Sequence, residues 1–461
     1  MERSRRARTA AFFAILAAAA LFRIPCLRTE PWMDEIWSLH FARGAKSVAD
    51  VLFGIHHDNN HPLNTLWLYL VRGSGDWAVW RLFSLACGLA TVGVMALDDQ
   101  DPPRGLLTAA LAAGSAVLVL YSTEARGYAA AALCAVACHR LLSSGASPRP
   151  ARVAAFAFFA ALGFFGHPTF IFALAALGVW AAVALPPERR ARNLCLLFGP
   201  AAVLGVAYEL LQRGPLRIGA GAFRPFAPVA FRTLAQWSGA PDAGPAAVLG
   251  AATLAGLCAW ELRRLRNERD DEFYFFAVLL GTVVAFVAIL PFRYERYFFA
   301  VLPFALMLAG RSLLRLLRAG RAAKAAAVLM IGLSIAGGAV RVRTLATLGR
   351  GHYREAVQFM AAETSDDYIT VGSDHAFRNG MLLQFYASYL PPSKRLVYVS
   401  PEGYRDNPPQ WYLRHTFDTD PRLAPTGLLF GGKTAYALAG IYPYSGLSGW
   451  TWLLYRRTTA I

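Results

Sequence analysis

The sequence predicts a mainly α-helical membrane protein, with a bundle of about eleven transmembrane helices followed by a small extracytoplasmic α/β domain. Three observations support this prediction. The 461 residues are 56% hydrophobic and only 16% charged, which excludes a disordered chain and an ordinary soluble protein. Long apolar segments alternate with short arginine-rich loops up to about residue 340. From Arg341 onward the chain becomes polar and its pattern changes.

The distribution of charge and of cysteine argues against a nucleic-acid-binding protein, a disulfide-rich protein and a zinc protein. The formal net charge is +17, but the arginines cluster in loops between apolar spans, without aromatic residues arranged as a stacking face, so we do not expect nucleic-acid binding. The cysteines lie in or beside apolar spans, and Cys134 and Cys138 have no His or carboxylate partners at metal-binding spacing. We therefore expect no disulfide framework, zinc site or cofactor. A divalent metal is compatible with the sequence, but nothing indicates one.

The first predicted element is a membrane helix over residues 10–27. It follows Arg3, Arg5, Arg6 and Arg8, and such a basic start holds the amino end inside. We interpret this segment as a retained anchor, because no convincing small-residue cleavage site follows it.

The remaining spans follow from the length of each apolar segment, since a spanning helix needs about 20 mostly apolar residues. We expect them near residues 78–97, 105–122, 127–142, 153–166, 168–185, 194–211, 244–262, 273–291, 297–314 and 322–340. Residues 62–72 are apolar, but a helix of that length rises only about 16 Å, so we expect it to lie at the membrane surface. With this choice, every arginine-rich loop shares the face of the N-terminus, as the positive-inside rule requires.

Polar and charged residues are concentrated on the opposite, outer face, whereas the central parts of the spans contain almost no charge. They occur at residues 34–35, 56–62, 122–128, 167 and 292–297, and in an arginine-containing loop over 212–243. Positive charge on this face runs against the insertion rule, and an anionic lipid headgroup is its simplest explanation. Transporters place ionisable residues near the membrane midplane, whereas here they lie at helix ends, which favours surface chemistry on a lipid-linked substrate.

Residues 341–461 are expected to form the separate α/β domain, so we divide the chain into a membrane domain, 1–340, and this second domain. Helical patterns at about 352–363 and 376–390 precede strand-like segments at 368–371 and 395–399. The segment 450–455 also alternates like a strand.

Asp34 and Glu35 are the candidate catalytic residues. They follow the first span and lie between Trp32 and Trp37, where the chain leaves the hydrocarbon. A carboxylate at a partly dry interface has a raised proton affinity, which suits it to deprotonate an acceptor hydroxyl. Adjacent side chains point in different directions, so we assign the base to Asp34 and a positioning role to Glu35. The alternative is a solvated loop with two interfacial tryptophans.

Arg126, Arg293 and Arg296 are the candidate phosphate binders, because the guanidinium fork matches phosphate oxygens. Two alternatives remain for these arginines. They can extend toward the membrane interface without binding substrate, or they can form ion pairs with Glu124 and Glu295.

Further residues on the outer face are expected to contact substrate. These candidates are His57, Asp58, His61, Glu124, Tyr128 and His167. The histidine spacing around residues 56–61 fits no standard zinc pattern, so substrate contact is preferred there over a metal or a purely structural role. His61-Pro62 also suits the start of a helix.

These motifs, taken in order, resemble the GT-C glycosyltransferases, in the protein mannosyltransferase and aminoarabinose transferase branch (the family 39 type). The resemblance rests on the acidic pair after the first span, His-Pro-Leu at 61–63, Glu-Ala-Arg-Gly-Tyr at 124–128 and Arg-Tyr-Glu-Arg-Tyr at 293–297. It covers about residues 1–340. The resemblance implies a membrane transferase that takes a sugar from a polyprenyl phosphate, with its active site on the outer face of a bacterial inner membrane.

The resemblance also implies roles for single residues. Asp34 matches the usual base, and Arg126, Arg293 and Arg296 match basic positions near the lipid phosphate. Two features depart from the family: Leu63 stands where proline is common, and the loop 212–243 is shorter and more basic than expected. The acceptor is therefore left open as a lipid, a glycan or a protein.

The resulting hypothesis is an inverting glycosyltransferase with an aspartate base. One alternative is a ligase or polymerase of lipid-linked glycan, which needs room for two lipid-linked substrates. Another is a lipid or glycan transporter, which needs a continuous polar path through the spans. The sugar, the acceptor and the oligomeric state do not follow from the sequence.

Overall fold

The computed structural model describes residues 2–98, 100–143, 149–212, 214–219, 221, 223–404, 407–418, 424–430 and 434–458. The chain divides into two compact units. The first comprises Met1–Leu27 and Phe41–Val342, and the second comprises Arg28–His40 and Arg343–Ile461. The second unit thus contains a short segment from near the N-terminus, in addition to the C-terminal residues.

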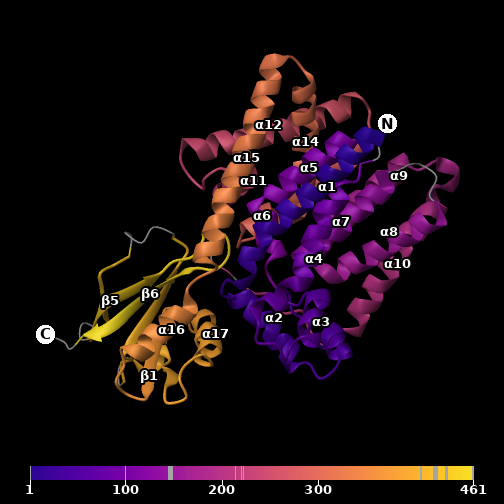
Figure 1. Cartoon of the computed structure of the whole chain (residues 1–461). Coiled ribbons are helices and arrows are strands. Elements are labelled where there is room, and N and C mark those ends of the chain that lie inside the picture. Colours follow the sequence, from indigo (N-terminus) through magenta and orange to yellow (C-terminus); the bar gives the residue numbers. More distant parts are fainter. Residues whose placement is uncertain are drawn as a thin grey trace. The chain divides into compact units, whose positions relative to one another are not determined.

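The first unit is a bundle of helices (Figure 1). Its first half contains α1 Glu2–Arg23, η1 Ile24–Arg28, η2 Asp50–Gly54, α3 Pro62–Leu70, α4 Trp77–Ala96, α5 Pro102–Gly114, α6 Ala116–Ser122, α7 Tyr128–Ser143 and α8 Pro150–Gly166. Its second half contains α9 Phe170–Ala184, η3 Pro187–Arg189, α10 Arg190–Leu211, α11 Phe226–Ser238, α12 Pro245–Asn267, α13 Glu272–Ile289, η4 Glu295–Val301, α14 Leu302–Arg318 and α15 Arg321–Leu348. The helix α2, Met33–Gly44, crosses the boundary between the units.

The prediction of a multi-pass membrane bundle is confirmed. Within the described residues, seven helical segments are long and apolar enough to cross a membrane. The helices α5 and α6, which are bent by 70° at Ser115, are long and apolar enough to cross only when they are taken together as one broken span. The helices α7, α8 and α9 are apolar but shorter, at 16, 17 and 15 residues. These helices lie at the positions of the eleven expected spans, but only seven of them, or eight with the bent pair, have the length of a full span within the described residues.

Within residues 62–72, Pro62–Leu70 form the short helix α3 of nine residues, which rises only about 13 Å. It begins with Pro62 directly after His61, as the motif indicates. The loop expected over 212–243 is partly wrong, because Phe226–Ser238 fold into the amphipathic helix α11. Its buried side faces α12 through Ala235, Ala247 and Ala251. Pro228 lies in its first turn, where proline is tolerated, so the proline did not prevent the helix.

Close helix crossings in this unit depend on small residues, as is usual where helices pack within a membrane. A Cβ atom on Gly338 of α15 would overlap the carbonyl oxygen of Gly114, and one on Gly337 would overlap that of Gly239. The pair Gly337-Gly338 therefore lets α15 approach the backbones of two other segments.

The second unit is an α/β domain, as predicted. Its sheet contains β1 Tyr368–Ser373, β2 Arg395–Tyr398, β3 Trp411–Thr416, β4 Gly427–Phe430, β5 Thr434–Tyr442 and β6 Thr451–Thr458. The strand order is β2-β1-β3-β6-β5-β4. The first three strands are parallel and the rest pair antiparallel. The expected strands at 368–371, 395–399 and 450–455 correspond to β1, β2 and β6, whereas β3, β4 and β5 were missed.

Two helices accompany this sheet (Figure 1). The helix α16, Tyr353–Ala362, packs against β5 and β6, and α17, Ala376–Ala387, packs against β1 and β2. Both helices were expected from their patterns. The buried side chains of this unit include Trp411, Trp450 and Trp452, so the unit has its own hydrophobic core.

Candidate active site

The sequence Glu-Ala-Arg-Gly-Tyr forms a buried turn between α6 and α7. The turn is fixed from two neighbouring helices. The His61 ring accepts from the Gly127 N–H at 3.2 Å, and Asn64 donates its amide to the Ala125 carbonyl at 2.6 Å. Ser84 of α4 donates to the Arg126 carbonyl at 3.0 Å. The turn is therefore held rigidly by its backbone.

Gly127 explains why the motif contains a glycine. A Cβ atom at this position would overlap the carbonyl oxygen of Gly166, which ends α8. The glycine thus allows the turn to lie directly against the α8–α9 connection. That close approach brings His167, the residue after Gly166, to the same place.

A set of stacked rings surrounds this turn. His61 and His167 have ring centroids 4.5 Å apart, and Tyr128 stacks on His167 at 4.1 Å. The guanidinium of Arg126 lies 5.3 Å from the centre of the Tyr128 ring. Four residues that the sequence proposed separately, His61, Arg126, Tyr128 and His167, are thus brought together.

The two histidines lie in a strongly positive environment. Burial lowers the pKa of His61 well below its ordinary value, and the neighbouring His167, Arg126 and Arg296 lower it further. Burial, Arg126 and Arg296 act on the pKa of His167 in the same direction. Both rings are therefore neutral near pH 7, and the positive charge of this cluster comes from the two arginines. His61 Nε2 is buried without a hydrogen-bond partner among the described residues, so it is available to a polar ligand.

Arg296 and Arg293 are close in sequence but have different surroundings. The Arg296 guanidinium lies 4.7 Å from the centre of the Tyr294 ring and acts electrostatically on both histidines. Arg293 instead donates to the carbonyls of Val287 and Ala288 at 2.9 and 2.6 Å, and to that of Arg224 at 2.8 Å. It therefore satisfies the C-terminal carbonyls of α13, which otherwise lack partners.

Glu295, between these two arginines, is also engaged. Its two carboxylate oxygens accept from Arg224 at 2.9 and 3.0 Å, a bidentate arrangement. This pair joins the segment before α11 to η4. The positive charge of Arg224, which the sequence placed on the outer face, is thus largely balanced within the protein.

The segment with His57 and Asp58 is held by the residues after α10. Asp58 accepts from His57 at 2.8 Å and from the Gly219 N–H at 3.0 Å, and its own N–H donates to the Arg217 carbonyl at 3.0 Å. Burial raises the pKa of Asp58, but His57, Gly219 and the charge of Arg126 lower it more, so the net shift is downward. Asp58 is therefore a stable anion that clamps two loops.

Asp34 and Glu35 belong to the second unit and lie in the first turn of α2. Both are buried, at 4% and 2% exposure. Glu35 has a defined structural environment. Its Oε2 lies 3.6 Å from Nε of the buried Arg350, which also donates to Thr29 at 2.6 Å. The same oxygen accepts from the Trp32 N–H at 3.4 Å, so Glu35 caps α2 in the manner of a capping-box glutamate.

Contacts within the second unit fix the position of α2. Trp32 contacts Trp450 with ring centroids 6.3 Å apart, and Trp37 contacts Phe377 at 5.1 Å. Tyr386 donates to the Pro31 carbonyl at 2.6 Å. Asp34 lies between the two tryptophans in sequence, so its backbone is held from both sides by residues of the C-terminal region. The tryptophans that suggested a membrane interface thus also serve as packing anchors.

Glu30 lies at the start of the same segment, and its shifted pKa predicts that the stability of the protein depends on pH. It accepts from the Arg354 N–H at 2.8 Å. Burial raises its pKa from 4.5 to about 7, although Arg354 and Tyr353 oppose the shift. The folded protein thus binds this proton more tightly than the unfolded chain does. The contribution that protonated Glu30 makes to the free energy of unfolding is complete below about pH 4.5, and it is lost as the pH rises through 7.

We expect Glu30→Gln, which stays neutral, to be increasingly more stable than the wild type as the pH rises from about 5 to about 8. The measurement is the unfolding temperature of each purified protein across this range. Glu363→Gln, at an exposed carboxylate paired with Arg456, is the matched control. A difference between Glu30→Gln and wild type that is constant with pH would contradict the assignment.

A second group of charges lies at the other end of the first unit. Glu272, at the start of α13, is within 2.9 Å of His139 and 2.5 Å of Arg311. Asp98 pairs with Arg104 at 2.5 Å, and Glu261 with Arg315 at 3.0 Å. From the sequence, the arginines at this end were expected only to orient the chain in the membrane. The partners of Arg311 and Arg315 lie 39 and 54 residues away in sequence, so no local motif marks these two pairs.

No cluster of three or more His, Cys, Asp or Glu side chains arranged for a metal ion occurs in the described part of the chain. The expectation that the protein needs no cofactor remains a prediction.

Comparisons with known proteins identify the fold. No protein-family model and no curated protein sequence matches the chain. The crystal structure of ArnT from Cupriavidus metallidurans in the apo state is similar, with a TM-score of 0.54 and 14% identity over 97% of this chain and 98% of that chain. The same protein bound to undecaprenyl phosphate gives 0.53 and 13%, over 97% of both chains.

A third similar structure is the Archaeoglobus fulgidus oligosaccharyltransferase complex with Zn and sulfate. Its TM-score is 0.49 at 10% identity, over 88% of this chain and 68% of that one. The likeness to ArnT extends over nearly the whole chain, including the C-terminal unit. The chain therefore has the fold of ArnT, in agreement with the fold that the motifs predict.

Proposed function

We propose that this chain is an integral-membrane glycosyltransferase that moves a sugar from a polyprenyl phosphate to a hydroxyl acceptor. The observation that carries the proposal is the likeness to ArnT over almost the full length of both chains, including the form bound to undecaprenyl phosphate. A shared fold does not by itself imply a shared function. The proposal therefore also depends on the chemistry of the residues gathered at the buried turn.

The arginine cluster supports the proposed donor. Arg126 and Arg296 both act on His61 and His167, so two cations face one small region. A phosphate anion is the ligand that such a pair suits, since guanidinium groups donate in a fixed fork. Neutral His61 can add a hydrogen bond without adding charge. We assign Arg126 and Arg296 to the donor phosphate, and we assign Arg293 to the end of α13.

The proposed reaction needs one proton acceptor. The acceptor oxygen attacks the anomeric carbon while the bond from that carbon to the phosphate oxygen breaks. The polyprenyl phosphate leaves with the bonding electrons, and Asp34 receives the proton of the acceptor hydroxyl. Arginines stabilise the charge that grows on the leaving phosphate, so no general acid is required. Attack opposite the leaving group inverts the anomeric centre.

We further propose a location for this chemistry. The arginine-rich loops favour an N-terminus on the cytoplasmic side of a bacterial inner membrane, with the candidate residues and the C-terminal unit on the outer side. The acceptor is a lipid, a glycan or a protein that reaches that surface.

The arginine assignment predicts different behaviour for neighbouring residues. Arg126→Ala and Arg296→Ala should each weaken binding of undecaprenyl phosphate by about 1–3 kcal/mol, which is roughly 5- to 150-fold. Replacement by lysine should restore only part of this affinity, because the fork is lost. The measurement is a titration of the purified full-length protein with undecaprenyl phosphate.

Arg293→Ala is the matched control from the same motif. It should leave the affinity unchanged but lower the unfolding temperature, because three backbone carbonyls lose their donor. Wild-type affinity in both Arg126→Ala and Arg296→Ala would show that these arginines do not bind the phosphate.

A further inference from the structure

We propose that a hollow between α8 and α10, at the arginine-rich end of the first unit, binds an anionic phosphoglycerolipid. The headgroup phosphate would lie on Arg189 and Arg192, and one acyl chain would follow the two helices away from them. This site lies among residues other than those of the candidate active site. It does not depend on the proposed function.

The size and shape of the hollow suit one lipid chain with its headgroup. Its volume is about 820 Å³, within the range typical of ligand pockets. It is lined by Pro150, Val153, Ala154, Ala157, Pro186, Glu188, Arg189, Arg192, Asn193, Leu196 and Pro200. The helices α8 and α10 pack against each other (Figure 1). Small alanines on α8 leave room between them.

The lining changes from polar to apolar along the helices. Arg189 and Arg192 lie at the start of α10, whereas Leu196 and Pro200 lie one and two turns further along. On α8, the lining residues recur from Pro150 to Ala157 at helical spacing, a distance of about 10 Å. An entrance lined by basic side chains, followed by an apolar groove, is the arrangement expected of a lipid-binding site. Basic pockets between membrane helices commonly bind anionic headgroups.

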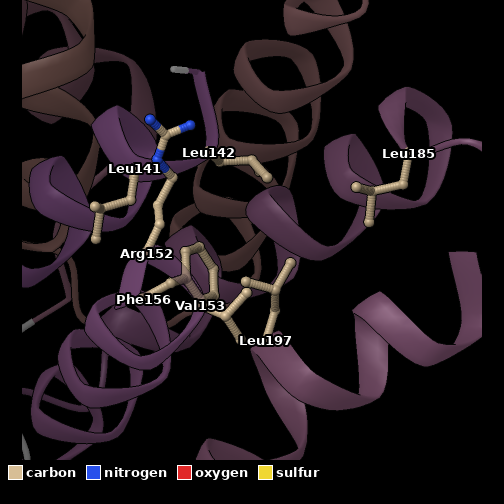
Figure 2. A pocket seen from close by; sticks show the side chains of 7 residues that line it. All are labelled: Leu141, Leu142, Arg152, Val153, Phe156, Leu185 and Leu197. Atoms are coloured by element: carbon tan, nitrogen blue, oxygen red, sulfur yellow. The ribbon is translucent and has the colours of Figure 1, made fainter. Parts of the chain in front are cut away.

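A small second cavity extends the apolar character of this region (Figure 2). Its volume is about 20 Å³. It is lined by Leu141, Leu142, Arg152, Val153, Phe156, Leu185 and Leu197. Val153 lines both spaces. The interface of α8 with α10 is thus loosely filled beside the larger hollow.

The state of the arginines points to an anionic ligand. Several other arginines at this end are paired with protein carboxylates, including Arg104 with Asp98 and Arg311 with Glu272. Within the described residues, neither Arg189 nor Arg192 has a carboxylate within 4.0 Å. Glu188 also lines the mouth, but the two arginines outnumber it. A lipid with one net negative charge would complete the balance.

The test uses the full-length protein, purified in detergent and depleted of lipid, with palmitoyl-oleoyl phosphatidylglycerol as the probe. Native mass spectrometry counts the bound lipids during a titration. We expect one tightly retained phosphatidylglycerol and roughly tenfold weaker retention in the double variant Arg189→Gln/Arg192→Gln. Phosphatidylethanolamine and phosphatidylcholine should be retained more weakly than phosphatidylglycerol by the wild type.

Two further variants separate a defined site from general attraction to lipid. Arg263→Gln/Arg321→Gln removes two exposed arginines that do not line the hollow and should keep wild-type retention. Ala157→Trp fills the groove, leaves both arginines in place and should also weaken retention. Equal retention of the three lipids, or equal loss in the two arginine double variants, would overturn the proposal. So would full retention by Ala157→Trp.

Discussion

Replacing Asp34 with asparagine should lower turnover roughly 10²–10⁴-fold, which is the usual contribution of general base catalysis. Asparagine keeps the size of the side chain and most of its hydrogen bonding, but it cannot accept the acceptor's proton. Asp34 is 4% exposed and lies in the first turn of α2, whose position is fixed by the aromatic contacts of Trp32 and Trp37. Donor binding and expression should therefore stay at wild-type levels.

The rate of sugar transfer in membranes that contain equal amounts of each variant is the measurement. Asp76→Asn is a suitable control, because Asp76 caps α4 by accepting from the Ala78 N–H and has no role in the proposed step. Turnover near wild type in Asp34→Asn would remove Asp34 from the mechanism, and the base would have to be sought elsewhere.

Breaking the buried pair of Glu35 and Arg350 should produce the second large effect, on stability. Glu35 and Arg350 are 2% and 0% exposed. Removal of one partner leaves an uncompensated buried charge, which typically costs about 3–5 kcal/mol. We expect Glu35→Ala and Arg350→Ala each to lower the unfolding temperature strongly. The double variant Glu35→Leu/Arg350→Met should recover much of the loss, since neither charge is then buried alone.

This experiment also decides the role of Glu35, which the sequence placed beside Asp34 in the catalytic pair. If Glu35 acts only through structure, activity in the double variant should return together with stability. A stable double variant that remains inactive would instead give Glu35 a direct part in the reaction. The unfolding temperature and the transfer rate must therefore be measured on the same preparations.

The helical architecture could be predicted because each span is encoded locally. A run of apolar residues and the arginines beside it are contiguous, so length and charge were sufficient for most helices. The bend at Ser115 was not predicted, because α5 and α6 together form one continuous apolar segment. The strands β4 and β5 were missed for a different reason. They form an antiparallel pair at the edge of the sheet, and this pairing is made only after folding. In addition, β4 has only four residues, which is too short for an alternating pattern to stand out in the sequence.

The candidate site was predictable in its composition but not in its pairings. The buried turn with Arg126 and Tyr128 could be located from its motif. The different surroundings of Arg293 and Arg296 could not, because they depend on which carbonyls and rings lie near each guanidinium after folding. Similarly, Arg350 lies far from Glu35 in sequence, so the buried ion pair of Glu35 could not be foreseen when Glu35 was given a positioning role beside Asp34.

The mass of the lipid that copurifies with the protein tests the central claim most directly. Asp34→Asn, extracted from its native membrane in mild detergent, should retain a polyprenyl phosphate that carries a sugar, because the donor binds but is not consumed. The wild type should retain mainly the bare polyprenyl phosphate. The same measurement would identify the sugar. If both proteins contained only phospholipid, and neither bound added undecaprenyl phosphate, transfer from a polyprenyl-phosphate donor would be contradicted.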